Sequence, residues 1–287
     1  MIVSDGEAKL MFELLVMSSE ALAKALSSLL LPAVIFFLFS LLVKGRDTFE
    51  AIKGCFSENI QNLFWLTLNT VLVTPLLVLL YRWVSLSGVT LDYMEMLWSS
   101  MPSFIVVFCA VFCGDFIGYW RHRLEHTRFL WPGHLIHHSD RKMSWLTLER
   151  FHPVNRLTTF LIDGSLLLFL GFPPYAVIAN SLIRHYYGFF IHADLPWTYG
   201  WWGKIFVSPV MHRWHHAEEK AAHHTNFATV FSVFDQWFGT YRVPGLCNKR
   251  LGVSNRVGAS LIGQLCYPFK VEAYRKRVDQ YGDQQIN

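Results

Sequence analysis

The sequence predicts an all-α integral membrane protein with about four to five membrane helices and a cytoplasmic, helical, histidine-rich cap. Residues of the AVILMFWYC set make up 53% of the 287-residue chain, and charged residues make up 16%, against about 25% in soluble domains. Long stretches carry no charge, and all thirteen histidines lie between residues 122 and 224. This composition excludes an ordinary soluble domain and a disordered chain.

Three uncharged stretches are long enough to cross a bilayer as helices. They comprise residues 25–43, 59–81 and 96–114. A helix of nineteen residues extends about 28 Å, which suits a hydrocarbon core of roughly 30 Å. We therefore expect three membrane spans, each with a proline that neighbouring helices can accommodate.

A further apolar region, residues 157–191, is interrupted by Gly-Phe-Pro-Pro at 171–174. Its first arm would form a helix of about 21 Å, which is short for the membrane core. We expect a hairpin that either spans the bilayer with tilt or re-enters from one side. Asp163 and Arg184 lie near the same end of the two arms, as expected if both arms approach one membrane face.

Basic residues predict the orientation of the chain. Residues 120–156 hold seven Lys and Arg and residues 193–287 hold eleven, whereas residues 82–101 hold only Arg82. The positive-inside rule then places residues 44–58, residues 120–156 and the C-terminal third in the cytoplasm, with the N-terminus outside.

Eight of the histidines form three compact groups with spacings of three or four residues. The groups are His122 and His126; His134, His137 and His138; and His212, His215 and His216. Such spacings place the imidazoles of each group on one face of a helix. A lone histidine pair is usually structural, but burying eight imidazoles without a cation costs free energy. The three groups therefore predict a metal centre.

The number of histidines predicts how many ions bind. A typical zinc site uses three or four protein ligands, so eight imidazoles indicate two metal ions. Asp115 shares a helix face with Tyr119, His122 and His126. Its carboxylate could accept a hydrogen bond from an imidazole and orient it, or it could serve the structure alone.

The ordered motifs resemble those of the fatty acid hydroxylase/sterol desaturase superfamily. The resemblance covers roughly residues 100–245 and rests on five elements. They are Asp115-Phe-Ile-Gly-Tyr-Trp-Arg-His122 with His126, Trp131 and His134-x-x-His137-His138; Phe151-His152-Pro153; Phe190-Ile-His192; Pro209-Val-Met-His212-Arg-Trp-His215-His216; and Asn226-Phe-Ala228 followed by Phe234-Asp235-Gln-Trp-Phe238-Gly239-Thr240.

The resemblance implies two non-haem irons, O2 as co-substrate, and the hydroxylation or desaturation of an aliphatic C–H bond of a lipid. It implies that the eight grouped histidines bind the irons and that His192 is a ninth ligand. Asp115 and Asp235 are the candidate residues that would act through these ligands. Four further histidines are left open as ligands: His152, His185, His223 and His224.

The resemblance also implies an organisation of the chain and a set of partners. We expect membrane spans over residues 1–100, a fatty acid hydroxylase-like catalytic domain over 101–245 and a cytoplasmic tail over 246–287. The substrate would be a lipid such as a fatty acyl chain or sterol taken from the bilayer. A ferredoxin, a b-type cytochrome or a reductase would supply electrons. The chain lacks a long basic block, and we expect no nucleic-acid partner.

Two other functions remain open from the residues alone. A dizinc membrane hydrolase could use the same histidines, and metal identity together with oxygen dependence would distinguish it. A metal transporter would place its histidines near the bilayer midplane, whereas these lie beyond the ends of the spans. Residues 284–287 carry no retrieval signal of the KDEL type, which favours a bacterial inner membrane over the endoplasmic reticulum.

Overall fold

The structure, a computed structural model, describes residues 5–86, 91–253 and 260–275. Within these ranges the regular elements are helices, and no strand is present, which confirms the all-α fold. The N-terminal helices are α1 (Asp5–Ser28), α2 (Leu30–Lys44), α3 (Asp47–Gly54), α4 (Phe56–Leu68), the π-helix η1 (Asn69–Val73), α5 (Thr74–Leu86) and α6 (Asp92–Ser99).

The central and C-terminal helices are α7 (Ser103–Glu125), α8 (Trp131–His134), η2 (His137–Ser139), η3 (Trp145–Glu149), α9 (Pro153–Thr159), the π-helix η4 (Phe160–Gly164), α10 (Ser165–Phe169), α11 (Pro174–His192), η5 (Gly200–Lys204), α12 (Pro209–His215), η6 (Lys220–Ala222), α13 (Val233–Trp237), α14 (Leu261–Cys266), η7 (Tyr267–Phe269) and α15 (Val271–Arg275).

Three helical stretches among the described residues are long and apolar enough to cross a membrane. They are Met11–Lys44, Phe56–Leu80 and Ser103–Glu125. The first two overlap the predicted spans 25–43 and 59–81. The chain is therefore a multi-pass membrane protein.

The predicted third span, residues 96–114, is wrong in its bounds. The helix α7 begins at Ser103 and continues to Glu125, and the residues before it form the separate helix α6. Pro102 lies at the N-cap of α7 with a ψ of 137°, and proline disfavours a helical conformation in the residue before it, Met101. Because Asp115 is charged, hydropathy predicts that the span ends before it. The protein instead buries this side chain completely within α7.

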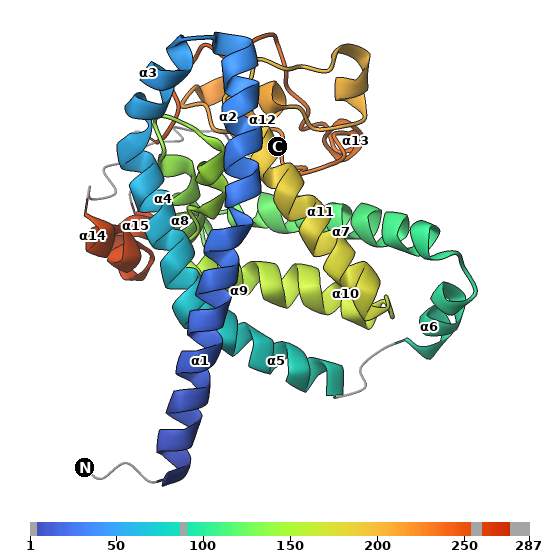
Figure 1. The fold of residues 1–287 in the computed structure, drawn as a ribbon. Coiled ribbons are helices and arrows are strands. Elements are labelled where there is room, and N and C mark those ends of the chain that lie inside the picture. The colour runs from blue at the N-terminus through green and yellow to red at the C-terminus, as the bar shows by residue number, and fades with distance from the viewer. Residues whose placement is uncertain (1–4, 87–90, 254–259, 276–287) are drawn as a thin grey trace.

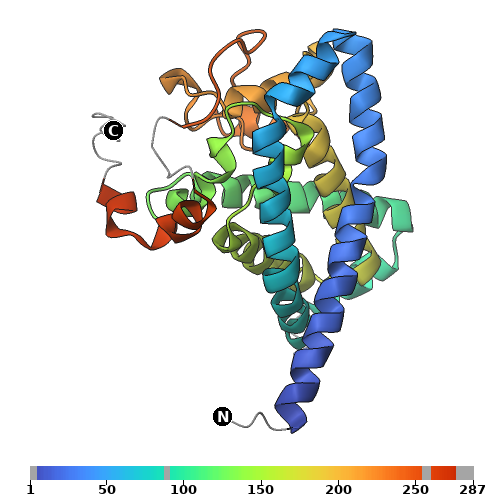
Figure 2. The same ribbon diagram turned by 60° about the vertical axis from the view of Figure 1, so that its left-hand side comes forward.

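The N-terminal helices form a long antiparallel pair. Helices α1 and α2 make a rod, the chain reverses through α3, and α4, η1 and α5 return beside it (Figures 1 and 2). Gly45 makes the turn before α3 with a φ of 57°, which glycine adopts without steric cost. Ser18 donates a hydrogen bond from α1 to the Val71 carbonyl in η1 at 3.0 Å.

Helices α7 and α11 pack closely because α7 has glycines where α11 sends large polar side chains. A Cβ atom on Gly114 would overlap the Asn180 amide, and one on Gly118 would overlap the Arg184 guanidinium. Arg184 is held in place by Asp163 of η4, whose carboxylate accepts a hydrogen bond from it at 2.9 Å. This ion pair agrees with the expectation that Asp163 and Arg184 lie at the same level of the hairpin.

The hairpin formed by α9, η4, α10 and α11 lies alongside α7. Its tip packs against α6, where the Trp98 and Phe172 rings stack with centroids 4.3 Å apart. Trp98 also donates a hydrogen bond to the Leu170 carbonyl at 2.8 Å. The tip of the hairpin thus reaches the end of the molecule at which α7 begins.

A cap of short helices and loops lies over one side of α7 and over the C-terminal end of α11. Helices α3, α12 and α13 lie on this side of the molecule (Figure 1). Asp194, just after α11, accepts hydrogen bonds from Lys44 of α2 at 2.5 Å and from Arg213 of α12 at 2.8 Å. In the predicted tail, Gln264 of α14 accepts a hydrogen bond from Arg150 at 3.1 Å. Residues 276–287 of that tail lie outside the described residues.

The substitution Gly118→Ala should destabilise the protein, because the added methyl group displaces Arg184 from its buried carboxylate partner. We expect a loss of about 1–3 kcal/mol, as for other over-packed cores, seen as a lower unfolding temperature in detergent. Gly164→Ala is the control, since its Cβ would meet only the Phe160 ring at 4.0 Å. Equal unfolding temperatures for the two variants would contradict the role assigned to Gly118.

Candidate metal centre

All nine predicted histidine ligands come together in the cap. Helix α7 supplies His122, and its C-cap is His126. His134 ends α8, and His192 ends α11. Two further histidines, His137 and His138, lie in the turn η2. Helix α12 begins with Ser208 as N-cap and Pro209 at its first position, and it supplies His212, His215 and His216.

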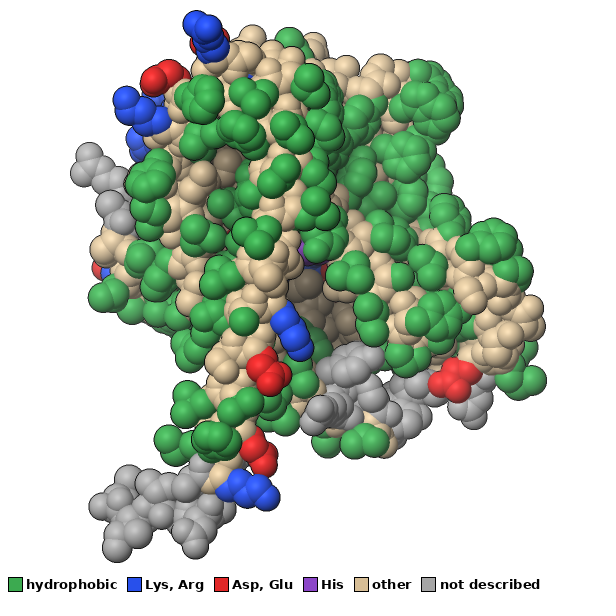
Figure 3. Space-filling view, viewed as in Figure 1, with side chains coloured by type: hydrophobic (Ala, Val, Ile, Leu, Met, Phe, Trp, Pro, Cys, Tyr) green, Lys and Arg blue, Asp and Glu red, His purple; other side chains and the backbone are tan. Residues whose placement is uncertain are grey.

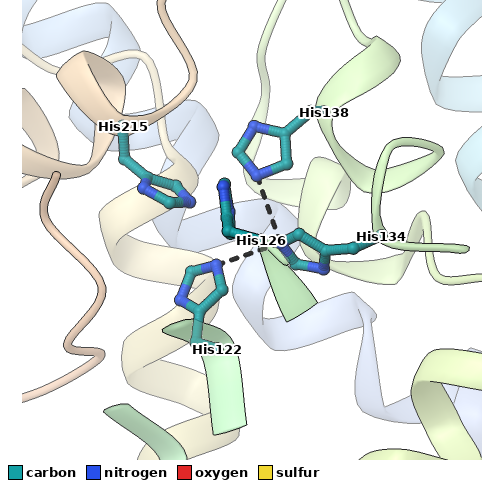
Figure 4. A group of neighbouring side chains, drawn as sticks. All are labelled: His122, His126, His134, His138 and His215. Carbon is teal, nitrogen blue, oxygen red and sulfur yellow. Dashed lines mark hydrogen bonds between the residues drawn. The ribbon is translucent and has the colours of Figure 1, made fainter. Parts of the chain in front are cut away.

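The nine imidazoles form two groups. The five-histidine group consists of His122, His126, His134, His138 and His215, which are drawn in Figure 4. The four-histidine group consists of His137, His192, His212 and His216. Within each group the ligand atoms lie within 4.8 Å of one another. The arrangement agrees with two ions and with His192 as a member of the set.

Each His-His doublet is divided between the two groups. His138 and His215 join the five-histidine group, whereas their sequence neighbours His137 and His216 join the other. The rings of His138 and His216 stack across the boundary, with centroids 4.4 Å apart. The two groups are therefore adjacent, and the doublets hold them in a defined relation.

Backbone carbonyls determine which nitrogen of several rings faces the centre. Nδ1 of His122 lies 2.8 Å from the Phe227 carbonyl, and Nδ1 of His215 lies 2.7 Å from the Thr225 carbonyl. A carbonyl only accepts hydrogen bonds, so these Nδ1 atoms carry the protons. Each Nε2 then offers a lone pair, and Nε2 of His215 is buried without a hydrogen-bond partner.

The contact between His122 and His134 tests whether a cation fits. Their Nε2 atoms lie 3.0 Å apart, and Nδ1 of His134 lies 3.4 Å from the Glu125 carboxylate, which favours its proton on that side. With its proton on Nδ1, His134 would present a lone pair at Nε2 toward that of His122, and the two would repel. Two nitrogens bound at about 2.1 Å to one ion and at right angles would lie about 3.0 Å apart. The donor set therefore fits a transition metal ion.

Sequence reasoning missed two residues that contact His134. Glu125 is fully buried, and it accepts hydrogen bonds from Arg121 at 2.6 Å and Thr158 at 2.7 Å. The Asn155 amide lies 3.2 Å from Nδ1 of His134. A signal for Glu125 was present, because a carboxylate directly before His126 is an unusual charge in a buried histidine motif.

The two candidate aspartates contact backbone rather than imidazole. Asp115 accepts hydrogen bonds from the N–H groups of Thr229, Val230 and Phe231 at 2.8–3.2 Å. Its direct contact with an imidazole, one of the two expected alternatives, is therefore not made by the described residues. Helix α7 turns this carboxylate toward the 229–231 loop instead.

Asp235 supports the same loop from α13. It accepts hydrogen bonds from the N–H groups of Phe227 and Ala228 and from the Thr240 hydroxyl at 2.7–3.0 Å. Because the Phe227 carbonyl holds the His122 ring, Asp235 influences that ring through one peptide segment.

The four histidines left open lie outside both groups. His152 caps α9 by accepting the Val154 N–H at 3.1 Å, and its other nitrogen lies 3.0 Å from the Leu265 carbonyl. His185 lies 3.5 Å from Glu149. The ring of His224 lies 6.0 Å from that of His126, and the neighbouring His223 is likewise in neither group.

Burial keeps the clustered imidazoles in the neutral form that binds metal. Desolvation, followed by repulsion from neighbouring imidazoles, lowers the pKa of His134, His138 and His216 well below 6.5. Desolvation also lowers the pKa of His215 to about 4 and raises that of Asp235 to about 6. Neutral imidazole is the form that coordinates metal ions.

A cavity of about 470 Å³ connects the histidines to the membrane helices. Residues of both groups line one end, among them His122 and His212. Apolar residues of the hairpin, such as Leu167 and Ile178, line part of the remainder, together with polar side chains such as Asp163, Asn180 and Arg184. A molecule with an apolar chain can therefore reach the centre from the membrane part.

The fold and the site define an all-α, multi-pass membrane protein with a buried, two-part histidine centre. Residues 107–240 match the model of the fatty acid hydroxylase family. This segment, which contains the nine grouped histidines, is therefore similar to the fatty acid hydroxylase superfamily, as its motifs indicated.

Several proteins to which the chain is similar are lipid hydroxylases or monooxygenases by name. Ornithine lipid hydroxylase OlsE of Rhizobium tropici is 28% identical over 182 residues, which cover 62% of this chain and 55% of that protein. Alkylglycerol monooxygenase of Danio rerio is 27% identical over 62% of this chain and 39% of its own length. The Homo sapiens protein of that name is 30% identical over 50% of this chain and 32% of its own length.

The chain spans about half or less of the length of these relatives. No solved structure matches it.

The stability of the metal-free protein should fall as the pH falls from 7.5 to 5.5. Below about pH 6.5 the unfolded chain binds protons on imidazoles that the folded state keeps neutral, so unfolding takes up protons. Asp235 acts in the opposite sense, because its raised pKa contributes stability at low pH that is lost as the pH rises through 6. The clustered histidines outnumber Asp235, so their contribution to the pH dependence of stability prevails. Thermal unfolding in detergent after chelation should show this decrease, and a constant or rising unfolding temperature would contradict it.

Proposed function

We propose that the protein is a membrane-bound, non-haem di-iron oxygenase that hydroxylates or desaturates a C–H bond of a lipid. The observation that carries the proposal is the pair of adjacent histidine groups at the end of a cavity lined by membrane helices. The names of the relatives support this reaction class. They also support an amphipathic lipid as substrate.

The nine histidines would hold the two metals. The five-histidine group would hold one ion and the four-histidine group the other. Two irons bound there would supply the oxidation of an aliphatic C–H bond by O2, chemistry that protein side chains cannot perform. Hydroxylation consumes one O2, two electrons and two protons and yields the alcohol and one water. Desaturation consumes the same reactants and yields the alkene and two waters.

The remaining residues of the centre would act by orientation. The carbonyls that accept the Nδ1–H protons of His122 and His215 keep their Nε2 atoms directed at the ions, and Glu125 does the same for His134. Hydrogen bonds of this kind raise the basicity of a ligand and fix its tautomer. Asp115 and Asp235 would act further out, by holding the loop whose Phe227 carbonyl contacts His122.

The location of the centre suits a reaction that takes its lipid from the bilayer and its electrons from the aqueous side. The lipid would enter along the hairpin from the bilayer, and a separate ferredoxin, b-type cytochrome or reductase would deliver electrons to the cap. The basic residues around the cap favour a cytoplasmic location.

The two-metal arrangement can be tested with adjacent residues. His215→Ala should weaken binding of the ion in the five-histidine group and His216→Ala that in the four-histidine group, so each purified variant should retain less iron than the two ions held by the parent. His152→Gln is the control, since it removes a buried histidine outside both groups and should retain about two. Elemental analysis gives the count. At most one ion in the parent protein would refute a two-metal centre.

Turnover decides between the oxygenase and a dizinc hydrolase. The purified protein, supplied with lipid extract, ferredoxin, ferredoxin reductase and NADPH, should consume O2 and shift the mass of a lipid by one oxygen or by two hydrogens. NADH alone should support no turnover, because the electrons need a carrier. Lipid hydrolysis that proceeds without O2 by a zinc-loaded protein would establish the alternative.

A further inference from the structure

A second, polar cavity adjoins the one that reaches the histidines. It has a volume of about 250 Å³ and is lined by α1 and the α4–η1–α5 segment on one side and by Glu149 of η3, Arg156 of α9 and His185 of α11 on the other. Leu77, Arg156 and His185 line both cavities. Figure 3 shows this face of the molecule hollowed between α1 and the hairpin, with a histidine side chain visible inside the hollow.

The junction of the two cavities carries polar groups whose bonding capacity is only partly used. Arg156 donates a hydrogen bond to Glu149 at 2.8 Å, but Nε of Arg156 and Oε1 of Glu149 are buried without a hydrogen-bond partner. Glu149 is 1% exposed, and a buried, unsatisfied carboxylate oxygen costs free energy. Nε2 of His185 lies 3.5 Å from this oxygen.

Asn69 adds an unused acceptor to the same cavity. Its amide nitrogen donates hydrogen bonds to the Trp65 and Phe151 carbonyls at 2.9 and 2.7 Å. Because two carbonyls hold the nitrogen, the orientation of the amide is determined, and Oδ1 remains buried without a partner. Asn69 also begins the π-helix η1, and π-bulges occur often at functional sites.

This polar junction lies close to the metal centre. The Arg156 guanidinium lies over the Phe151 ring at 5.2 Å. The other neighbour of that ring is His137 of the four-histidine group, stacked on it with centroids 4.5 Å apart and planes 3° apart. A group bound at Arg156 is thus separated from His137 by one aromatic ring.

We propose that Arg156, Glu149, His185 and Asn69 bind the headgroup of the substrate lipid, and that this headgroup carries uncharged hydroxyl groups. Hydroxyl groups can donate to Oε1 of Glu149 and Oδ1 of Asn69 and accept from Nε of Arg156. A phosphate would meet the Glu149 carboxylate, and Arg156 is already neutralised by that carboxylate. A lipid without a polar group would leave all three atoms unpaired.

The position of the junction has a consequence for the reaction. Since only the Phe151 ring separates Arg156 from His137, a headgroup held there presents its own neighbouring carbons to the centre. The lipid is therefore oxidised near its headgroup, and not near the far end of its chain. This inference rests on the proposed oxygenase function.

Equilibrium binding to the intact, metal-loaded protein tests the headgroup site without turnover. Three probes share a C16 chain: a monoacylglycerol with two hydroxyls, a methyl ester with none, and a lysophosphatidic acid with a phosphate. The monoacylglycerol should bind at least about tenfold more tightly than the other two, which corresponds to two well-formed hydrogen bonds. Equal binding of the methyl ester, or tightest binding of the phosphate lipid, would overturn the proposal.

Substitutions identify the residues responsible. His185→Phe and Arg156→Met should abolish most of the preference for the monoacylglycerol and leave the affinity for the methyl ester unchanged. Tyr186→Phe is the matched control, because Tyr186 adjoins His185 on α11 but is 44% exposed and lies outside the lining of both cavities. A preference that survives in both variants would refute the assignment. Circular dichroism and iron content show that each variant is folded.

Turnover separates this inference from the proposed function. With ferredoxin, ferredoxin reductase and NADPH, the His185→Phe and Arg156→Met variants should have a KM for the monoacylglycerol roughly tenfold higher than that of the parent, with little change in kcat. Mass spectrometry should locate the new oxygen or double bond in the half of the lipid nearest the headgroup. Oxidation near the methyl end would refute the inference and leave the oxygenase intact, whereas selective binding without any oxidation would refute the oxygenase alone.

Discussion

The structure depends on one constraint, the burial of nine imidazoles in two adjacent groups. Nε2 of His122 and Nε2 of His134 lie 3.0 Å apart, and they repel when both carry lone pairs. A cation between them would relieve this repulsion, whereas burial opposes protonation. Metal binding would therefore stabilise the cap.

The cap is attached to the membrane helices by charges that are themselves buried. Arg121 of α7 donates hydrogen bonds to Asp163 of the hairpin at 2.8 Å and to Glu125 at 2.6 Å. Glu125 in turn contacts His134. The same residues that hold the hairpin against α7 thus reach the five-histidine group, so a disturbance of the helix packing can alter the geometry of the metal ligands.

Two loops supply the precision that the short helices of the cap lack. Helix α12 is a single well-capped unit of seven residues and cannot orient its own imidazoles. The backbone carbonyls of the 225–228 segment do so, and Asp115 and Asp235 hold that segment and the residues that follow it. Because the backbone of this segment orients the imidazoles, Asp115 and Asp235 act by accepting hydrogen bonds from its N–H groups.

The sequence by itself predicted the all-α membrane class, two of the three spans and eight of the nine grouped histidines, because hydropathy and i, i+3 and i+4 spacings are local properties, and it indicated His192 through the resemblance of its motifs. Local patterns misplaced the third span, since they count Asp115 as a charge and cannot show that three distant N–H groups surround it. Only the tertiary structure decided which histidines share a group, because each doublet is divided between partners far apart in sequence. It also revealed Glu125 and the Arg156–Glu149 junction, whose significance arises from neighbours that folding alone brings together.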